Sequence, residues 1–307
     1  MDTSGQIRAS SVSRSLVAVG DRWSLLILGA AFQGCVRFVD WSDRIGIASN
    51  VLSGRLRQLV ALGCLEMVKG DDGRGHEYRL TSMGMGLYPT ALMFWRFDRL
   101  WSEKRLLHPE ALTHLTCGGS MVPNMACRAC GERVHARDVG YEDGPGAGFD
   151  ASPPSRVSRR SAVVVDDDVS RNTLFGDSVD YLGDRWTQMV ISTLFLGTRR
   201  FDQIQRECDV ATNLLSDRLK SMVAGGMLQR RRYQIGPDRF EYLLTPRGMD
   251  VYPIALALMR WGDQWLGTAA GPPLLLHHLT CGNPLEAVVV CDQCGQSPDP
   301  HEVLFRR

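Results

Sequence analysis

The sequence lacks an excess of charge of either sign. Its 307 residues include 35 Lys and Arg against 34 Asp and Glu, a formal net charge of +1. A chain this close to neutrality has no overall field that draws it to nucleic acid or to a membrane, so any DNA binding must come from local basic patches. The length predicts about two domains, and a hydrophobic content of 44% is ordinary for a folded protein.

Long hydrophobic runs are also absent. The longest apolar stretch near the start, residues 25–32, is far shorter than the roughly 20 residues that a membrane-spanning helix needs. Residues 1–6 lack the charged and then apolar pattern of a signal peptide. We therefore expect a cytoplasmic protein without a membrane partner, in which nine cysteines point to metal or thiol chemistry rather than to disulfides.

Signs of catalysis are equally scarce. The sequence contains no nucleotide-binding loop, no open metal site and no paired carboxylates in a plausible cleft. It also offers no convincing pair of a nucleophile and a base. We therefore expect a protein that is not an enzyme.

The chain repeats itself over nearly its whole length. Gly-Asp-Arg-Trp at residues 20–23 recurs at 183–186, so Gly20 corresponds to Gly183 at an offset of 163 residues. After one inserted residue the offset becomes 164, and His-Leu-Thr-Cys-Gly at 114–118 recurs at 278–282. Such self-similarity indicates a tandem duplication of a unit of about 130 residues.

Each copy predicts the same series of elements. Apolar residues at helical spacing predict helices over residues 16–31, 38–45, 48–62 and 81–101. Between the last two, residues 65–69 and 76–80 alternate around a Gly-rich turn and predict a β-hairpin. This is the order of a winged helix, and residues 178–265 predict it a second time.

A set of short motifs accompanies this pattern. In the first copy they are Gly-Asp-Arg-Trp at 20–23, Arg-Phe at 37–38, Ile-Ala-Ser-Asn-Val-Leu-Ser at 47–53 and the segments 11–16 and 77–81. In the second copy they are the segments 200–201, 211–216 and 237–245. These motifs resemble the HxlR family of bacterial winged-helix regulators. The resemblance implies DNA binding and a homodimeric arrangement, and the chain resembles such a dimer fused into one polypeptide.

The second helix of each helix-turn-helix is expected to enter the major groove with its N-terminal end. Asn50 and Asn213 lie at that end, where an asparagine can bond adenine through two hydrogen bonds. Helix capping, which Ser49 or Asn50 also suits, is the alternative. The predicted DNA contacts from these helices are Ser49, Asn50, Ser53, Arg55, Arg57, Thr212, Asn213, Ser216, Arg218 and Lys220.

The two wings differ in charge. The first combines the predicted contact Arg74 with two aspartates at 71–72, whose carboxylates would repel phosphate. The second is basic and suits contact with the DNA backbone or the minor groove. Its predicted contacts are Arg230, Arg231, Arg232 and Arg239. We therefore expect the second wing to dock more strongly.

Six cysteines form two matching sets with a histidine. The pattern His-x2-Cys-x9-Cys-x2-Cys at 114–130 recurs at 278–294, and its two ligand pairs fit a closed, tetrahedral, structural zinc site. The expected ligands are His114, Cys117, Cys127 and Cys130 for one zinc ion and His278, Cys281, Cys291 and Cys294 for the other. A reduced hairpin without metal and a redox pair at residues 127 and 130 are the alternatives.

The other three cysteines, Cys35, Cys64 and Cys208, have no cysteine counterpart in the other copy, and we expect ordinary buried side chains. The resemblance adds one further expectation, because some HxlR relatives sense electrophiles through a cysteine just before the first helix. This chain has Ser10 there, and Thr173 in the second copy. That thiol switch is therefore expected to be absent.

Together these features predict a mainly α-helical fold with small β-hairpin wings, in two tandem winged-helix domains that are each followed by a small Cys/His ribbon. The expected segments are winged-helix repeat 1 at 8–104, zinc-ribbon-like segment 1 at 105–139, a flexible linker at 140–170, winged-helix repeat 2 at 171–267 and zinc-ribbon-like segment 2 at 268–307. The flexible linker is predicted because this segment is rich in Pro, Gly, Ser and charged residues.

The predicted function is sequence-specific regulation of transcription, as a repressor at the bacterial nucleoid. Two fused winged helices would act as a pseudo-dimer on a double-stranded DNA operator, and a homodimer of chains stays open. Six tryptophans predict core packing or, as a sharper hypothesis, a pocket between the repeats for a small-molecule effector; they are Trp23, Trp95, Trp101, Trp186, Trp261 and Trp265. The alternative function is a small-molecule-sensing or protein-interaction module with one degenerate DNA-binding repeat.

Overall fold

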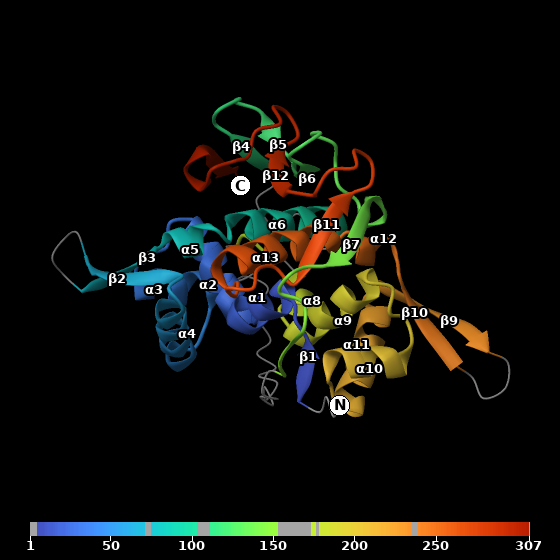
Figure 1. Cartoon of the computed structure of the whole chain (residues 1–307). Coiled ribbons are helices and arrows are strands. Elements are labelled where there is room, and N and C mark those ends of the chain that lie inside the picture. Colours follow the sequence, from blue (N-terminus) through green and yellow to red (C-terminus); the bar gives the residue numbers. More distant parts are fainter. Residues whose placement is uncertain are drawn as a thin grey trace. The chain divides into compact units, whose positions relative to one another are not determined.

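The computed structural model describes residues 5–70, 75–102, 111–152, 173–175, 178–234 and 239–306. Helices contain more of the described residues than strands do, and the strands form small sheets of two or three strands (Figure 1). No single helix in these ranges is long and apolar enough to cross a membrane, and only α1 (Ser11–Val19) and α2 (Arg22–Phe32) taken together, as a bent pair, reach that length and hydropathy.

The chain divides into two compact units that interleave along the sequence. Unit 1 comprises residues 1–17, 125–155 and 184–287, and unit 2 comprises 18–124, 156–183 and 288–307. These compact units do not follow the expected consecutive segments, 8–104, 105–139, 171–267 and 268–307, because residues from both repeats belong to each unit. Each unit holds the winged helix of one repeat together with segments from the other repeat.

The winged helix of unit 2 has the predicted order. Its helix-turn-helix is formed by α3 (Phe38–Ile45) and α4 (Ser49–Leu62), its wing by β2 (Leu65–Lys69) and β3 (His76–Leu80). The helices α2 (Arg22–Phe32), α5 (Ser82–Met85) and α6 (Tyr88–Trp101) complete it. Leu52, Leu56 and Leu59 give α4 a fully buried face, so the apolar spacing seen in the sequence forms the core.

The winged helix of unit 1 repeats this order. Its elements are α9 (Arg185–Phe195), α10 (Phe201–Cys208), α11 (Thr212–Ala224), β9 (Leu228–Gln234), β10 (Arg239–Leu244), α12 (Pro246–Met249) and α13 (Tyr252–Trp265). Leu215, Leu219 and Met222 form the buried face of α11. The turn before α11 contains Asp209 at a φ of 44°, where unit 2 has Gly46 at 57°.

Two of the predicted helices are each split in two. The helix expected over 16–31 is wrong, because α1 (Ser11–Val19) ends before Asp21, whose carboxylate caps α2 by accepting from the backbone N–H groups of Trp23 and Ser24, both at 3.2 Å. The helix expected over 81–101 divides into α5 and α6, with Thr81 as the N-cap of α5.

The first helix of each repeat packs in the unit that contains the other repeat's winged helix. In unit 1, the Ser15 hydroxyl of α1 donates to the Leu258 carbonyl of α13 at 2.9 Å. In unit 2, Ser178 of α8 (Ser178–Leu182) donates to the Asp98 carboxylate of α6, from its backbone N–H at 2.9 Å and from its hydroxyl at 2.5 Å. The two repeats therefore exchange their first helices.

The segments after the winged helices are exchanged in the same way. In unit 2, β4 (Ala111–His114) lies between β5 (Ser120–Met121) and β13 (Val303–Arg306). In unit 1, β7 (Val139–Asp143) pairs with β11 (Leu274–His278), and β1 (Gln6–Arg8) pairs with β8 (Phe149–Ala151). These segments also contain two further strands, β6 (Pro123–Cys127) and β12 (Ala287–Cys291), and two short 3-10 helices, η2 (Ala136–Asp138) and η3 (Pro300–Glu302).

These strands correct the expected flexible linker over 140–170. Residues 140–151 contain most of β7 and all of β8, because their backbones pair with β11 and β1. Polar composition was a poor guide there, since strand pairing uses backbone groups that any residue offers. The remainder of the expected linker, from 153 onward, lies outside the described residues.

Candidate metal centres and nucleic-acid interface

Both recognition helices present polar side chains at their N-terminal ends. Asn50 on α4 and Asn213 on α11 are exposed, as are Ser49 and Thr212 beside them. The N-cap positions belong to Ala48 and Ala211, neither of which makes a side-chain cap bond. The four polar side chains therefore face solvent without being the N-caps of their helices, although Thr212 accepts a hydrogen bond from the Gln205 amide at 2.9 Å.

Further along these helices, the structure separates the basic residues into two kinds. Arg57 and Lys220 are exposed. Arg55 instead pairs with Asp21 at 3.2 Å, and its counterpart Arg218 pairs with Asp184 at 2.5 Å. Both aspartates are the N-caps of α2 and α9, so each pair ties a recognition helix to the helix behind it. Ser53 and Ser216, also predicted contacts, are half-buried.

The second wing presents a row of arginines on exposed positions of its two strands. Arg231 pairs with Glu241 at 2.5 Å, and the Arg230 guanidinium lies 4.3 Å from the centre of the Phe240 ring. Arg232 and Arg239 are exposed as well. In the first wing Lys69 is exposed, whereas Arg74 and the aspartates at 71–72 lie outside the described residues. The predicted contrast between the wing tips therefore stays a prediction.

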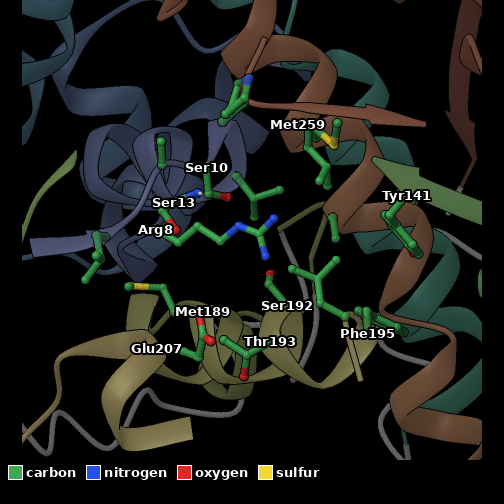
Figure 2. Close-up of a pocket in the computed structure, with 18 of the residues that line it drawn as sticks. Arg8, Ser10, Ser13, Tyr141, Met189, Ser192, Thr193, Phe195, Glu207 and Met259 are labelled. Atoms are coloured by element: carbon green, nitrogen blue, oxygen red, sulfur yellow. Dashed lines mark hydrogen bonds between the residues drawn. The ribbon is translucent and has the colours of Figure 1, made fainter. Parts of the chain in front are cut away.

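A cavity of about 100 Å³ lies within unit 1. Figure 2 shows its lining, which comes from residues 7–13, α9, α10, α13, β7 and β11. The sequence does not predict this cavity, because the expected effector pocket rests on six tryptophans and none of them lines it. Trp95 and Trp261 are each only 2% exposed, as core packing requires.

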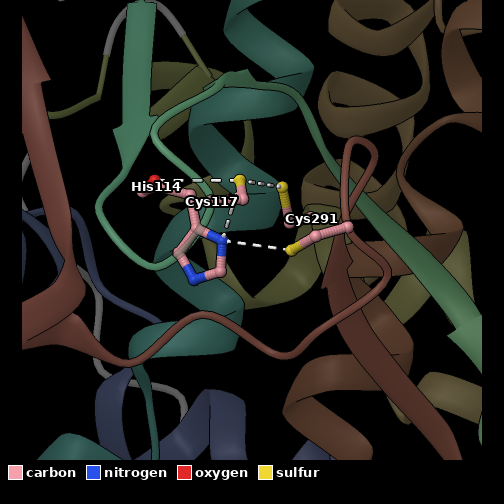
Figure 3. Close-up of side chains that lie close together, drawn as sticks. His114, Cys117 and Cys291 are labelled. Atoms are coloured by element: carbon pink, nitrogen blue, oxygen red, sulfur yellow. Dashed lines mark hydrogen bonds between the residues drawn. The ribbon is translucent and has the colours of Figure 1, made fainter.

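Two clusters of cysteine and histidine gather in the structure, one in each unit. The unit 2 cluster consists of His114, Cys117, Cys291 and Cys294. The His114 Nδ1 atom lies 3.3 Å from the Cys294 sulfur and 3.6 Å from the Cys117 sulfur, and the sulfurs of Cys117 and Cys291 are 4.0 Å apart (Figure 3).

The unit 1 cluster has the same composition. It consists of Cys127, Cys130, His278 and Cys281, and its ligand atoms all lie within 4.8 Å of one another. The His278 Nδ1 atom is 3.4 Å from the sulfurs of both Cys130 and Cys281. The structure thus brings all eight predicted ligands into two groups of four.

The predicted grouping of these ligands is wrong. The sequence analysis assigned His114, Cys117, Cys127 and Cys130 to one ion, but the structure combines the His-x2-Cys pair of each repeat with the Cys-x2-Cys pair of the other. The physical reason is strand pairing between the repeats. Because β4 pairs with β13 and β7 with β11, the end of each repeat lies beside the His-x2-Cys turn of the other.

The geometry of both clusters suits a tetrahedral ion with sulfur and nitrogen ligands. A tetrahedral zinc site with zinc–sulfur bonds of about 2.3 Å has ligands about 3.8 Å apart. The five separations given above, 3.3 to 4.0 Å, lie close to that value, and all ligand atoms of each cluster lie within 4.8 Å of one another. His114 and His278 are fully buried, and each directs Nδ1 at sulfur, which leaves Nε2 to carry the proton in a metal-bound imidazole.

The backbone of the two His-x2-Cys turns favours the thiolate, the form of cysteine that binds metals, whereas burial raises the pKa of Cys291 in the Cys-x2-Cys pair. A hydrogen bond from the Asn283 backbone N–H, supported by its side chain, lowers the pKa of Cys281 to about 6. A backbone hydrogen bond from Gly119 likewise lowers the pKa of Cys117. These N–H groups reach the sulfurs because Gly118 and Gly282 turn the chain at φ values of 69° and 73°, where a side chain would be strained.

The remaining three cysteines are buried, as predicted. Burial raises the pKa of Cys64 and of Cys208 to about 12, so neither is a reactive thiolate. The hydroxyl of Ser10, at the position of the family's sensing cysteine, accepts from the backbone N–H of Ser13 at 3.3 Å and so supports the start of α1.

Comparison with known proteins agrees with the fold. A family model described as HxlR-like helix-turn-helix matches residues 18–105 and 181–270. An uncharacterized HTH-type transcriptional regulator of Mycobacterium tuberculosis is 37% identical over 121 residues, covering 39% of this chain and 77% of that protein. Another, from Bacillus subtilis, is 31% identical over 93 residues, covering 30% and 86%. A solved structure of a proposed transcription factor from Pseudomonas aeruginosa shares 28% identity over 40% of this chain and 83% of its own, with a TM-score of 0.31.

Proposed function

The chain belongs to the HxlR-like helix-turn-helix family, and from this premise we propose that it is a sequence-specific transcription regulator that represses its target genes. Its two winged helices, one in each unit, would serve one operator as a pseudo-dimer within a single polypeptide. It would act on the bacterial chromosome in the cytoplasm. The observation that carries the proposal is the matched exposure of Asn50 and Asn213 at the N-terminal ends of the two recognition helices.

Base recognition is assigned to these ends. An asparagine amide can donate to N7 and at the same time accept from the N6 amino group of adenine, which makes a bidentate pair, and serine or threonine can bond either bases or phosphates. Because the helices differ at Ser49 against Thr212 and at Gly54 against Asp217, the two half-sites should differ too. We expect an imperfect inverted repeat as the operator.

Phosphate contacts are assigned to the exposed basic residues, Arg57, Lys220 and the four arginines of the second wing. Each neutralised phosphate releases counterions, so these residues would set the salt dependence of binding rather than its sequence preference. Arg55 and Arg218 take a different role, since they are only 29% and 25% exposed in their pairs with Asp21 and Asp184, whereas Arg231 is 60% exposed in its pair with Glu241. They would hold the recognition helices in place.

For the two Cys/His clusters we propose structural zinc. Three thiolates and one imidazole occupy all four coordination positions of a tetrahedral ion and leave none open for a substrate. The sites would therefore stabilise the fold rather than catalyse a reaction. Each cluster takes ligands from both repeats, so bound zinc would fasten the exchanged segments to each unit. The alternative of a thiol redox pair at Cys127 and Cys130 is less favoured, because His278 and Cys281 complete a set of four ligands around them.

The proposal is tested by selecting genomic DNA fragments with the purified full-length protein and measuring affinity for the selected site. Asn50→Ala and Asn213→Ala should each weaken binding to that site and relax its sequence preference at one position. Ser221→Ala, an exposed change at the other end of α11, is the matched control and should leave binding unchanged. Failure to enrich any sequence, or unchanged affinity in both asparagine variants, would contradict sequence-specific recognition.

A further inference from the structure

The cavity of unit 1 has a counterpart in unit 2 that an aromatic ring fills. Val12 lines the cavity, and at the repeat offset of 163 its counterpart is Phe175, which is only 3% exposed. The Phe175 ring packs 5.5 Å from the Phe94 ring. The ring also lies 2.6 Å from the point where a Cβ atom would be if Gly29 were replaced by a residue with a side chain. Gly29 is the counterpart of Ser192.

A second substitution has the same effect. Met259 lines the cavity in unit 1, and its counterpart at the offset of 164 is the larger, buried Trp95 in unit 2. The two repeats therefore keep the same framework, but unit 1 carries smaller side chains at these two positions, Val12 and Met259. Packed interiors seldom keep such voids without a reason, because each unfilled space forfeits contacts.

The polar groups of the cavity restrict what it can hold. Figure 2 shows the Arg8 side chain extending among the lining residues, and this guanidinium is hydrogen-bonded to Asp143. Glu207 adds a carboxylate on the exposed surface of α10. An anion therefore meets no uncompensated positive charge there, and a cation meets only a solvated carboxylate, whose attraction is weak.

The remaining lining is apolar apart from a few hydroxyl groups. Val12, Phe195, Leu256 and Met259 contribute apolar surface, and Ser192 contributes a hydroxyl. Apolar cavities of roughly 150 Å³ hold one benzene ring. The space here, about 100 Å³, is smaller, but it opens to solvent, so a single ring can enter it with its edge and a short substituent extending into the mouth.

We propose that this cavity binds an uncharged single-ring compound with one hydrogen-bonding substituent, and that this compound is the effector of the regulator. The effector role rests on the proposed function. The cavity is lined by Glu207 and Cys208 at the end of α10, and only residues 209–211 separate them from the recognition helix α11. If α10 has two arrangements and the ring binds one of them more tightly, binding shifts the population toward that arrangement. The position of the recognition helix α11 in unit 1 would then change with it.

Binding is tested first without DNA, by ¹⁹F NMR titration of 4-fluorobenzyl alcohol into the full-length protein. We expect one saturable site per chain, and at least tenfold weaker binding of the equally sized 4-fluorobenzoate and 4-fluorobenzylamine. Val12→Phe, made together with Ser192→Gly because unit 2 has Gly29 beneath its ring, and, independently, Met259→Trp should weaken binding of the alcohol at least tenfold by filling the cavity as unit 2 does. Val17→Phe, the same change at an exposed position of α1, is the control and should bind like the parent protein.

Absence of saturable binding would overturn the proposal. So would equal binding by the benzoate, or undiminished binding in both filled variants. Phe175→Val should open the counterpart space in unit 2 and add a second site. The effector role is measured separately, as a change of at least threefold in operator affinity on saturation with the alcohol, absent in Val12→Phe/Ser192→Gly. Saturable binding without that change would refute the effector role alone, whereas a protein that binds the ring but no DNA would refute the proposed function.

Discussion

The exchanged pairing of metal ligands makes a prediction that two double variants can test. Cys117→Ser with Cys294→Ser removes two ligands from one cluster, although the two residues come from different sequence motifs. Cys117→Ser with Cys130→Ser removes one ligand from each cluster, although both residues come from the same motif. A pairing within each motif would give the opposite assignment, so the two variants distinguish the arrangements.

The expected zinc contents follow from the number of intact sites. Structural zinc sites with four protein ligands contribute roughly 10–16 kcal/mol of binding free energy, and a site that has lost a thiolate is far weaker. The Cys117→Ser/Cys294→Ser protein should therefore keep one zinc ion per chain during mild competition with a chromogenic chelator. The Cys117→Ser/Cys130→Ser protein should lose both ions.

Metal is measured by plasma emission spectrometry on purified protein before and after the chelator. Cys35→Ala, a change at a buried cysteine outside both clusters, is the control and should keep two ions. The reverse result, no zinc in the first variant and one in the second, would refute the exchanged pairing. Fewer than one zinc per chain in the parent protein would refute the metal assignment itself.

Three further results are expected. Asn213→Ala should cost about 1–3 kcal/mol of operator binding at one base position, measured by fluorescence anisotropy; an affinity equal to that of Ser221→Ala would count against base contact. Arg231→Ala should weaken all DNA sequences alike and reduce the slope of log affinity against log salt by about one, and an unchanged slope would exclude a phosphate contact. Arg218→Ala should lower the free energy of unfolding by about 1 kcal/mol in urea titration, because it removes the half-buried pair with Asp184; stability equal to that of Lys220→Ala would show that the pair contributes nothing.

Local sequence patterns predicted the local structure well. The apolar spacing of α4 and the pairing of the two strands of the first wing are both confirmed, because side-chain periodicity acts over a few residues. The break before α2 was missed although its signal was present, since Asp21 followed by a helical pattern is an N-cap signature. A signal was also present for the pairs Asp21–Arg55 and Asp184–Arg218, because both members of each pair recur at the same offset in the two repeats.

The long-range arrangement could not be predicted from the same patterns. Because the two ligand motifs have identical spacing, their halves fit together within a repeat or between repeats equally well. Strand pairing of β4 with β13 and of β7 with β11 decides between them, and backbone pairing carries no residue signature. The cavity was missed for a related reason, since Val12 and Phe175 differ in size but not in apolar character.

We have proposed that a single chain supplies both winged helices to one operator. Native mass spectrometry measures this directly, on the complex with a duplex that carries one selected inverted repeat and with protein in excess. We expect a complex of one chain and one duplex, and an inverted repeat whose two halves differ. Two chains on one inverted repeat would contradict the proposal.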